Sequence, residues 1–310
     1  MEAEYHIPVL LNKVIEIFKS TEFRNPVFFD GTLGGGSYTE AILSEIPDST
    51  VIAVDKDINA ISFSKNRLKK FGSRVKFFNS SFAEIRSLVK QAGFDSLSGI
   101  VLDLGLSSYQ LEAEDGFSFM KDTPIDMRAD KRKELTAEKV LNENSPEDLE
   151  EMFLKYGEIY NPAEFVRNII SARRNKPIST TNDLLKIIES SFNIKGRARI
   201  KLIAKIFQAL RIFINNEIED LQNLLNTSLD ILNHGGIIIV VSYHSLEDRS
   251  VKNFFKDNSR EQKKSKYSRG EANPKPVLQL LTKKPVIPVE QEIRHNPRSR
   301  SAKLRAAMRI

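Results

Sequence analysis

The 310-residue chain contains no cysteine and only four histidines. The missing cysteines exclude a disulfide framework, thiolate ligands for zinc or an iron–sulfur cluster, and every mechanism that needs a thiol nucleophile. No apolar run approaches the roughly 18 residues of a membrane span, and the first residues are acidic where a targeting peptide would be basic. We therefore expect a cytoplasmic protein with no metal centre and no membrane segment.

The net charge of +6 is unevenly distributed along the chain. Residues 260–310 contain 14 lysines and arginines against 4 acidic residues, and residues 164–211 contain 11 against 3, so the remainder is net acidic. Basic clusters displace counterions from phosphates, so an acidic body with two basic segments favours a polyanionic partner. The alternative is a solvated basic surface that binds nothing.

Short apolar runs alternate with helical spacing in the first hundred residues. They cover residues 27–30, 51–55, 75–79 and 99–103, and three of them end in an aspartate: Asp30, Asp55 and Asp103. This alternation predicts an α/β fold with a doubly wound parallel sheet, which binds its ligand at the carboxyl ends of the strands. After a turn at residues 234–236, a further buried strand is predicted at 237–241, and an antiparallel pair at 277–281 and 302–308.

The strand pattern stops in the middle of the chain, and helix start signals replace it. These are Ser145 before Pro146, Asn161 before Pro162, and Thr180 with an acid three residues later. The pattern predicts an all-helical domain at residues 112–205, inserted into a sheet domain made of residues 1–111 and 206–310. A long amphipathic stretch from 200 to 232 is expected to form two helices that meet near Asn215 and Asn216.

The segment 31–37 (Gly-Thr-Leu-Gly-Gly-Gly-Ser) is a glycine-rich loop directly after the first predicted strand. It lacks the lysine of a Walker loop, and its spacing does not fit the Gly-x-Gly-x-x-Gly of dinucleotide sites. S-adenosylmethionine, which has no phosphate, fits better. The glycines allow close backbone approach, Asp55 is placed for the ribose hydroxyls, Phe82 for adenine, and Asp103 for the methionine part and its methyl group. The alternative is that these acids cap helices and the glycines only form a turn.

The lack of cysteine also restricts the methyl acceptor. Methylation at C5 of a pyrimidine normally uses a thiolate, and radical methylation uses a three-cysteine cluster. The acceptor is therefore expected to be a nitrogen or oxygen with its own lone pair. Direct transfer to such an atom depends on positioning and on a hydrogen-bond acceptor more than on a strong base.

Several longer segments resemble the bacterial ribosomal RNA small-subunit methyltransferase H family. They are residues 103–111 (Asp-Leu-Gly-Leu-Ser-Ser-Tyr-Gln-Leu), 126–130 (Asp-Met-Arg-Ala-Asp), 207–212 (Phe-Gln-Ala-Leu-Arg-Ile), 242–249 (Ser-Tyr-His-Ser-Leu-Glu-Asp-Arg) and 296–302 (Asn-Pro-Arg-Ser-Arg-Ser-Ala). The resemblance covers essentially the whole chain. It implies a class I, Rossmann-like S-adenosylmethionine methyltransferase sheet with an inserted helical domain, and methyl transfer to the exocyclic N4 of a cytosine in the decoding region of 16S ribosomal RNA.

Carried over by motif, the resemblance implies seven cofactor-binding residues: Gly36, Ser37, Tyr38, Asp55, Phe82, Asp103 and Gln110. The chain departs from the family at one of these places, since family members usually have Gly-Gly-His where this sequence has Gly36-Ser37-Tyr38. We expect backbone contacts to survive this change, whereas a contribution from the missing imidazole is lost.

Two residues are candidates for the methyl-transfer step itself. Asp103 can accept a hydrogen bond from the acceptor amine or hold the cofactor, and His244 is a candidate general base. A histidine directly after a strand is more often part of the hydrogen-bonded scaffold.

For RNA binding, which we assign in part to the inserted helical domain, the candidates are basic residues of the two basic segments. They are Arg173, Arg174, Lys195, Arg197, Arg199, Arg294, Arg298, Arg300, Lys303 and Arg305. The expected partner is small-subunit ribosomal RNA or an assembling small subunit, and the sequence does not decide between a monomer and a homodimer. Two rival functions stay open: a methyltransferase for DNA, protein or a small molecule, and a non-catalytic ribosome-assembly protein.

Overall fold

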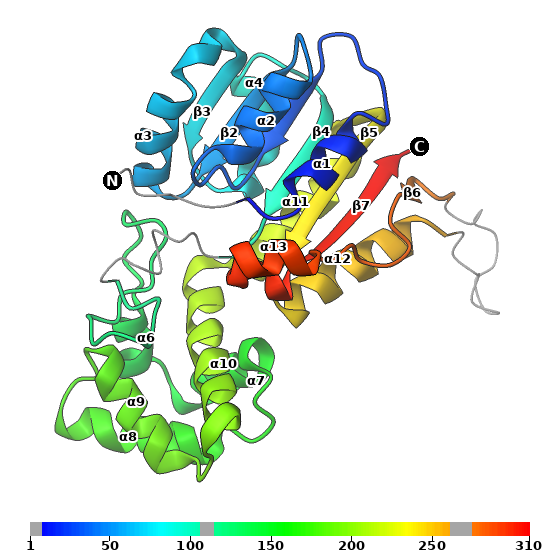
Figure 1. Ribbon diagram of the computed structural model, residues 1–310. Coiled ribbons are helices and arrows are strands. Elements are labelled where there is room, and N and C mark those ends of the chain that lie inside the picture. Colours follow the sequence, from blue (N-terminus) through cyan, green and yellow to red (C-terminus); the bar gives the residue numbers. More distant parts are fainter. Residues whose placement is uncertain (1–7, 106–114, 261–274) are drawn as a thin grey trace, which may run out of the picture. The chain divides into compact units, whose positions relative to one another are not determined.

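The computed structural model describes residues 8–105, 115–260 and 275–310, and the chain divides into two compact units. The sheet unit comprises residues 1–105 and 218–310, and the helical unit comprises residues 106–217. In Figure 1 the helical unit is green to yellow-green. Gln110 lies outside the described residues.

The boundaries between the units differ from those expected at 111/112 and 205/206. The chain leaves the sheet unit after Gly105 and returns to it at Ile218. The larger difference is at the second boundary, which lies at 217/218. Its cause is helix α10 (Gly196–Asn215), which packs against α7 (Pro146–Gly157). The whole of this long helix therefore belongs to the helical unit.

The sheet unit contains a seven-stranded sheet in the order β3-β2-β1-β4-β5-β7-β6 within the described residues (Figure 1). Its strands are β1 (Val27–Asp30), β2 (Thr50–Asp55), β3 (Val75–Asn79), β4 (Leu97–Asp103), β5 (Leu232–Ser242), β6 (Leu278–Leu280) and β7 (Lys303–Arg309). The pairs among β1–β5 are parallel, and β7 runs antiparallel to both β5 and β6. The predicted α/β fold with a parallel sheet and an antiparallel pair of final strands is confirmed.

The predicted turn at residues 234–236 is wrong, because these residues lie inside β5. The pairing of β5 with β4 shifts register here, between Leu97 and Gly99, and Gly235 has a φ of 81°. A glycine in this left-handed conformation accommodates the irregularity without breaking the strand.

Helices cover the sheet, and the apolar residues alternate between its two faces because successive strand side chains point in opposite directions. In β1, Phe28 belongs to one buried cluster and Phe29 to the other, and Val51 and Ile52 divide in the same way in β2. The helices of this unit are α1 (Leu11–Phe18), α2 (Ser37–Glu45), α3 (Ile58–Arg67), α4 (Ile85–Gln91), α11 (Glu217–Ile231), α12 (Ser245–Asn258) and α13 (Glu290–His295). Short 3₁₀ segments are η1 (Lys69–Arg74), η2 (Phe82–Glu84) and η3 (Pro297–Ser301).

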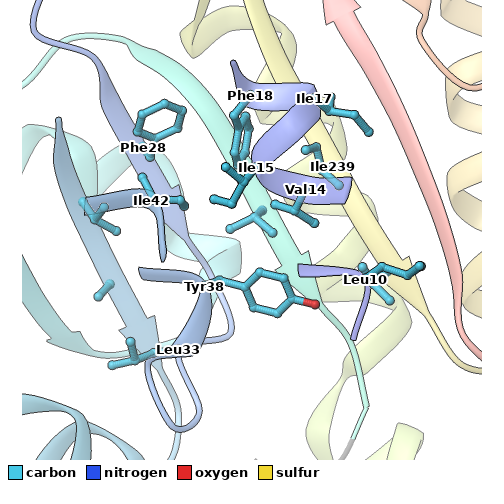
Figure 2. Packing of buried hydrophobic residues seen from close by; sticks show 14 of the residues in the cluster. Leu10, Val14, Ile15, Ile17, Phe18, Phe28, Leu33, Tyr38, Ile42 and Ile239 are labelled. Carbon is cyan, nitrogen blue, oxygen red and sulfur yellow. The ribbon is translucent and has the colours of Figure 1, made fainter. Parts of the chain in front are cut away.

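The cluster that contains Phe28 also contains the buried faces of α1 and α2. Figure 2 shows Phe18 of α1 beside Phe28, and the Tyr38 ring below Val14 and Ile15 with its hydroxyl directed toward the segment at Leu10. Tyr38 is thus an apolar core residue that places one polar atom at the edge of the cluster.

The helical unit is built from α6 (Ala137–Glu143), α7, α8 (Ala163–Asn175), α9 (Thr181–Ser191) and α10. Two predicted start signals are confirmed: Ser145 caps α7, and Thr180 forms a capping box with Asp183 at α9. The third is wrong in detail, because Pro162 takes the cap position of α8 without a side-chain hydrogen bond. Asn216, with a φ of 52°, separates α10 from α11 as expected.

Among the helices of the described residues, none combines the length and the apolar character that crossing a bilayer requires.

Gly99 of β4 provides a test of the packing beneath the sheet. A Cβ at this position would lie 2.6 Å from Phe18 Cε1 and 2.7 Å from Phe28 Cδ1. We expect Gly99→Ala to lower the free energy of unfolding by about 1–3 kcal/mol, as overpacked cores do, measured by urea denaturation. The loss should shrink when Phe18 and Phe28 are both changed to leucine, and an equal loss in that background would contradict the packing explanation.

Candidate active site

Three aspartates end adjacent strands at the same edge of the sheet. Asp30 is the last residue of β1, Asp55 of β2 and Asp103 of β4. Because β1 pairs with both β2 and β4 in parallel, Asp30 lies between the other two. The carboxyl ends of such strands form the ligand-binding crevice of open α/β sheets.

The backbone groups of the glycine loop form hydrogen bonds that hold the loop close to this edge of the sheet. The Gly34 amide donates to Asp55 Oδ2 at 2.8 Å, and the Gly34 carbonyl accepts from the Ser64 hydroxyl at 2.8 Å. A Cβ at Gly31 would lie 2.4 Å from a Leu102 methyl, and Gly36 has a φ of 79° where α2 begins. Both glycines are therefore required by the course of the chain.

Ser37 and Tyr38 form the first turn of α2, directly after the loop, and both are buried. The Ser37 hydroxyl accepts a hydrogen bond from Arg67, at 3.1 Å from its Nη1. The Tyr38 hydroxyl donates to the Val9 carbonyl. Burial is the main cause that raises the Tyr38 pKa well above its ordinary value, and the charge of Asp103 adds to it.

Asp55 has a local structural role at the end of β2. Its Oδ2 accepts from Gly34, and its Oδ1 accepts from the Asp57 amide at 2.9 Å. Asp57, not Asp55, caps α3. Burial raises the pKa of Asp55 to about 6, against the opposing effect of these hydrogen bonds. The carboxylate thus fixes the glycine loop to the end of β2.

Phe82 lies at the end of the next strand, where η2 begins. The side chain is 8% exposed, and the Lys56 ammonium lies 5.6 Å from its ring centroid. Lys56 pairs with Asp220 at 2.7 Å, and Asp220 also accepts from the Ser81 hydroxyl at 2.7 Å. An aromatic ring therefore lies beside a largely buried ion pair. It follows β3, the strand that neighbours β2 and its last residue, Asp55.

Asp30 is the site residue that the sequence interpretation left without a role. It is fully buried, and its carboxylate accepts from the Thr39 hydroxyl at 2.7 Å and from the Thr32 amide at 3.2 Å. Burial raises its pKa to about 7, and the charges of Asp55 and Asp103 add to the effect. The signal was present in the sequence, since Asp30 directly precedes the glycine loop.

Asp103 is held by a side chain from a distant part of the chain. Its Oδ1 accepts from the Tyr243 hydroxyl at 2.7 Å, and its amide donates to Thr32 Oγ1 at 2.7 Å. Tyr243 directly follows β5, the neighbour of β4. The sequence pattern contained no signal for this contact, which spans 140 positions.

His244 is used by the structure to start α12. Its Nδ1 accepts from the Glu247 amide at 3.4 Å, and its Nε2 lies 3.1 Å from Glu247 Oε1. Glu247 in turn accepts from the amides of Tyr243 and His244, at 2.8 and 3.2 Å. This capping box favours the scaffold role for His244 over that of a general base.

The basic candidates fall into two groups, engaged and exposed. Arg173 donates to two carbonyls at the end of α6, Arg199 pairs with Glu189, Arg294 pairs with Glu290, and Lys303 and Arg305 both contact Asp248. Arg305 is only 9% exposed. The exposed candidates without a described ion pair are Arg174, Lys195 and Arg197 in the helical unit and Arg298 and Arg300 in the sheet unit.

The sequence matches the MraW methylase family over residues 3–310. It is 41% identical over 309 residues to the ribosomal RNA small subunit methyltransferase H of Thermotoga neapolitana, across 98% of this chain and 95% of that protein. The proteins of the same name from Persephonella marina and Clostridioides difficile are each 39% identical, across 98% and 99% of this chain and 99% of each relative.

The buried Asp30 carboxyl makes stability depend on pH. Its folded pKa of about 7 lies above the ordinary value of 3.8, so the folded state keeps a proton that the unfolded chain loses. The free energy of unfolding should therefore fall as the pH rises from about 4 to about 7. Asp30→Asn removes this titration and keeps the shape.

The measurement is urea unfolding of both proteins at pH 5 and pH 8. We expect the stability of Asp30→Asn relative to the unchanged protein to rise by about 2–3 kcal/mol between these two values. Asp55 titrates in both proteins, so the comparison reports Asp30 together with its electrostatic coupling to Asp55. Parallel stability profiles would show that Asp30 is ionised in the folded protein.

Proposed function

Because the chain belongs to the MraW methylase family, we propose that it transfers the methyl group of S-adenosylmethionine to the exocyclic N4 of a cytosine in small-subunit ribosomal RNA. The observation that carries this proposal is the family match over nearly the whole chain, together with the name that its curated relatives bear. The decoding region as target follows from the family resemblance. A ribosomal substrate implies that the protein works in the cytoplasm.

The residues at the strand ends fit this cofactor. Gly31 and Gly36 let the loop run close to the strand ends, since a Cβ at Gly31 would lie 2.4 Å from Leu102 Cδ2 and Gly36 has a φ of 79°, and the loop from 31 to 36 contains no cation for a phosphate. Asp55 offers carboxylate oxygens for ribose hydroxyls, and Phe82 offers an aromatic face for adenine. Asp103 offers a negative charge for the methionine part. When bound, the cofactor supplies a methyl group on a positively charged sulfur.

The acceptor amine is a weak nucleophile because its lone pair is conjugated with the cytosine ring. A carboxylate that accepts a hydrogen bond from the amine holds the lone pair in the direction of transfer. We propose this role for Asp103, which ends β4 and accepts a hydrogen bond from the Tyr243 hydroxyl. His244 supports the site by starting α12 directly after β5.

Recognition of RNA is assigned to the exposed cations of both units. Helix α10 contains five lysines and arginines and no acidic residue, and Lys195 at its start makes no side-chain cap. Arg298 and Arg300 lie on η3 in the sheet unit. We propose that these residues bind phosphates, and that the target cytosine leaves its stack to reach the crevice.

The function is tested by mass spectrometry of nucleosides from small-subunit ribosomal RNA. Cells that lack the protein should lack N4-methylated cytosine at one position, the intact gene should restore it, and the Asp103→Ala gene should not. In parallel, the purified protein receives labelled cofactor with small subunits, naked RNA, DNA and cell extract. Label in DNA, protein or a small molecule and none in the RNA would refute the proposal, as would RNA binding without any transfer.

The salt dependence of RNA binding tests the phosphate contacts. Each lost phosphate contact lowers the slope of log affinity against log salt by about 1. The double variant Lys195→Ala, Arg197→Ala should therefore lower the slope by about 2, measured by fluorescence anisotropy on an RNA fragment. Lys90→Ala, an exposed lysine of α4 outside both basic segments, is the matched control. A slope unchanged in the double variant would exclude these two side chains from the interface.

A further inference from the structure

The three strand-end carboxylates are held in different ways. Asp30 and Asp55 each accept from a backbone amide of the adjacent loop, Thr32 for Asp30 and Gly34 for Asp55. The Asp103 carboxylate instead accepts from a tyrosine hydroxyl that is 140 positions away in the sequence. A side chain from a neighbouring strand end therefore contributes to its orientation.

The backbone makes this contact rigid. Asp103 is paired with Val241 across β4 and β5, and the Leu104 amide donates to the Val241 carbonyl at 2.9 Å. Tyr243 follows two residues later, and its own amide donates to Glu247 Oε2 at 2.8 Å. The base of the tyrosine side chain is thus fixed both to the sheet and to the start of α12.

The ring is held by a glycine. Gly105 has a φ of 109°, and a Cβ at this position would lie 3.1 Å from Tyr243 Cδ2. The ring therefore lies against the Gly105 backbone, which only a glycine leaves open. Two residues of one segment, Asp103 and Gly105, contact the hydroxyl and the ring of Tyr243.

The hydroxyl keeps its proton. Burial raises the pKa of Tyr243 far above its ordinary value, and the charge of Asp103 adds to the effect. Asp103 also contributes to the raised pKa of Tyr38, so a second tyrosine lies close to the same carboxylate. Tyr243 is therefore the donor in its hydrogen bond to Asp103.

We propose that Tyr243 is a positioning residue, whose hydroxyl fixes the Asp103 carboxylate in the orientation that binds the amino-acid part of the cofactor. This inference rests on the proposed function for the identity of the cofactor. Tyr243 need not touch the cofactor or the RNA to act in this way. A site built on a carboxylate gains from such support, because a small change in orientation weakens charged hydrogen bonds.

The test is a double-mutant cycle on cofactor binding with the full-length protein. Tyr243→Phe keeps the ring against Gly105 and removes only the hydroxyl. Calorimetry with S-adenosylhomocysteine should give a Kd about tenfold higher than that of the unchanged protein, in the range expected for a hydrogen bond to a charged group. In the Asp103→Ala background, which has no side-chain acceptor for the hydroxyl, the same change should leave the Kd unaltered.

Two results would overturn the inference: an unchanged Kd in Tyr243→Phe, or an equal rise in both backgrounds, which indicates a general structural effect. Tyr160 of the helical unit is 90% exposed. Tyr160→Phe therefore serves as the control for the loss of a tyrosine hydroxyl elsewhere in the protein, and its Kd should not change. Thermal unfolding of Tyr243→Phe checks that the fold is retained. The cycle needs no RNA, so a failure to methylate ribosomal RNA would refute the proposed function and leave this result standing.

Discussion

The parallel pairing of β2, β1, β4 and β5 is the constraint on which the candidate site depends. It brings Asp55, Asp30 and Asp103 to one edge of the sheet, although the three lie far apart in the sequence. The register of β4 and β5 then sets Tyr243 beside Asp103. A shift of one residue in either pair would turn these side chains to the opposite face.

Three neighbouring carboxylates at one edge are unfavourable in the absence of a ligand. Burial raises the pKa of Asp30 and Asp55, and mutual repulsion adds to the shift of Asp30. The protein offsets this cost with donors from the loop, from Thr39 and from Tyr243. A cofactor that carries two positive charges, on its sulfur and its amino group, is complementary to such an edge.

The compositions of the two units fit the separate roles that we propose for them. The sheet unit places acidic and aromatic residues at the strand ends, where we propose that the cofactor binds. The helical unit carries a long helix, α10, with basic residues and no acids. Its cations next to Gly196 are exposed, whereas Arg305 and Lys303 in the sheet unit are bound to Asp248. The exposed cations of the helical unit are therefore better suited to bind phosphates than Lys303 and Arg305.

The sequence by itself determined the order of strands and helices, the glycine loop and the aspartates at the strand ends, because each depends on local patterns of apolar, acidic and glycine residues. It also predicted the capping at Ser145 and Thr180, which involves residues three positions apart. Only the tertiary structure decided that α10 belongs wholly to the helical unit, that Arg305 is buried against Asp248, and that Tyr243 holds Asp103. These contacts join residues that are distant in the chain, and no local pattern records which strand ends will be neighbours.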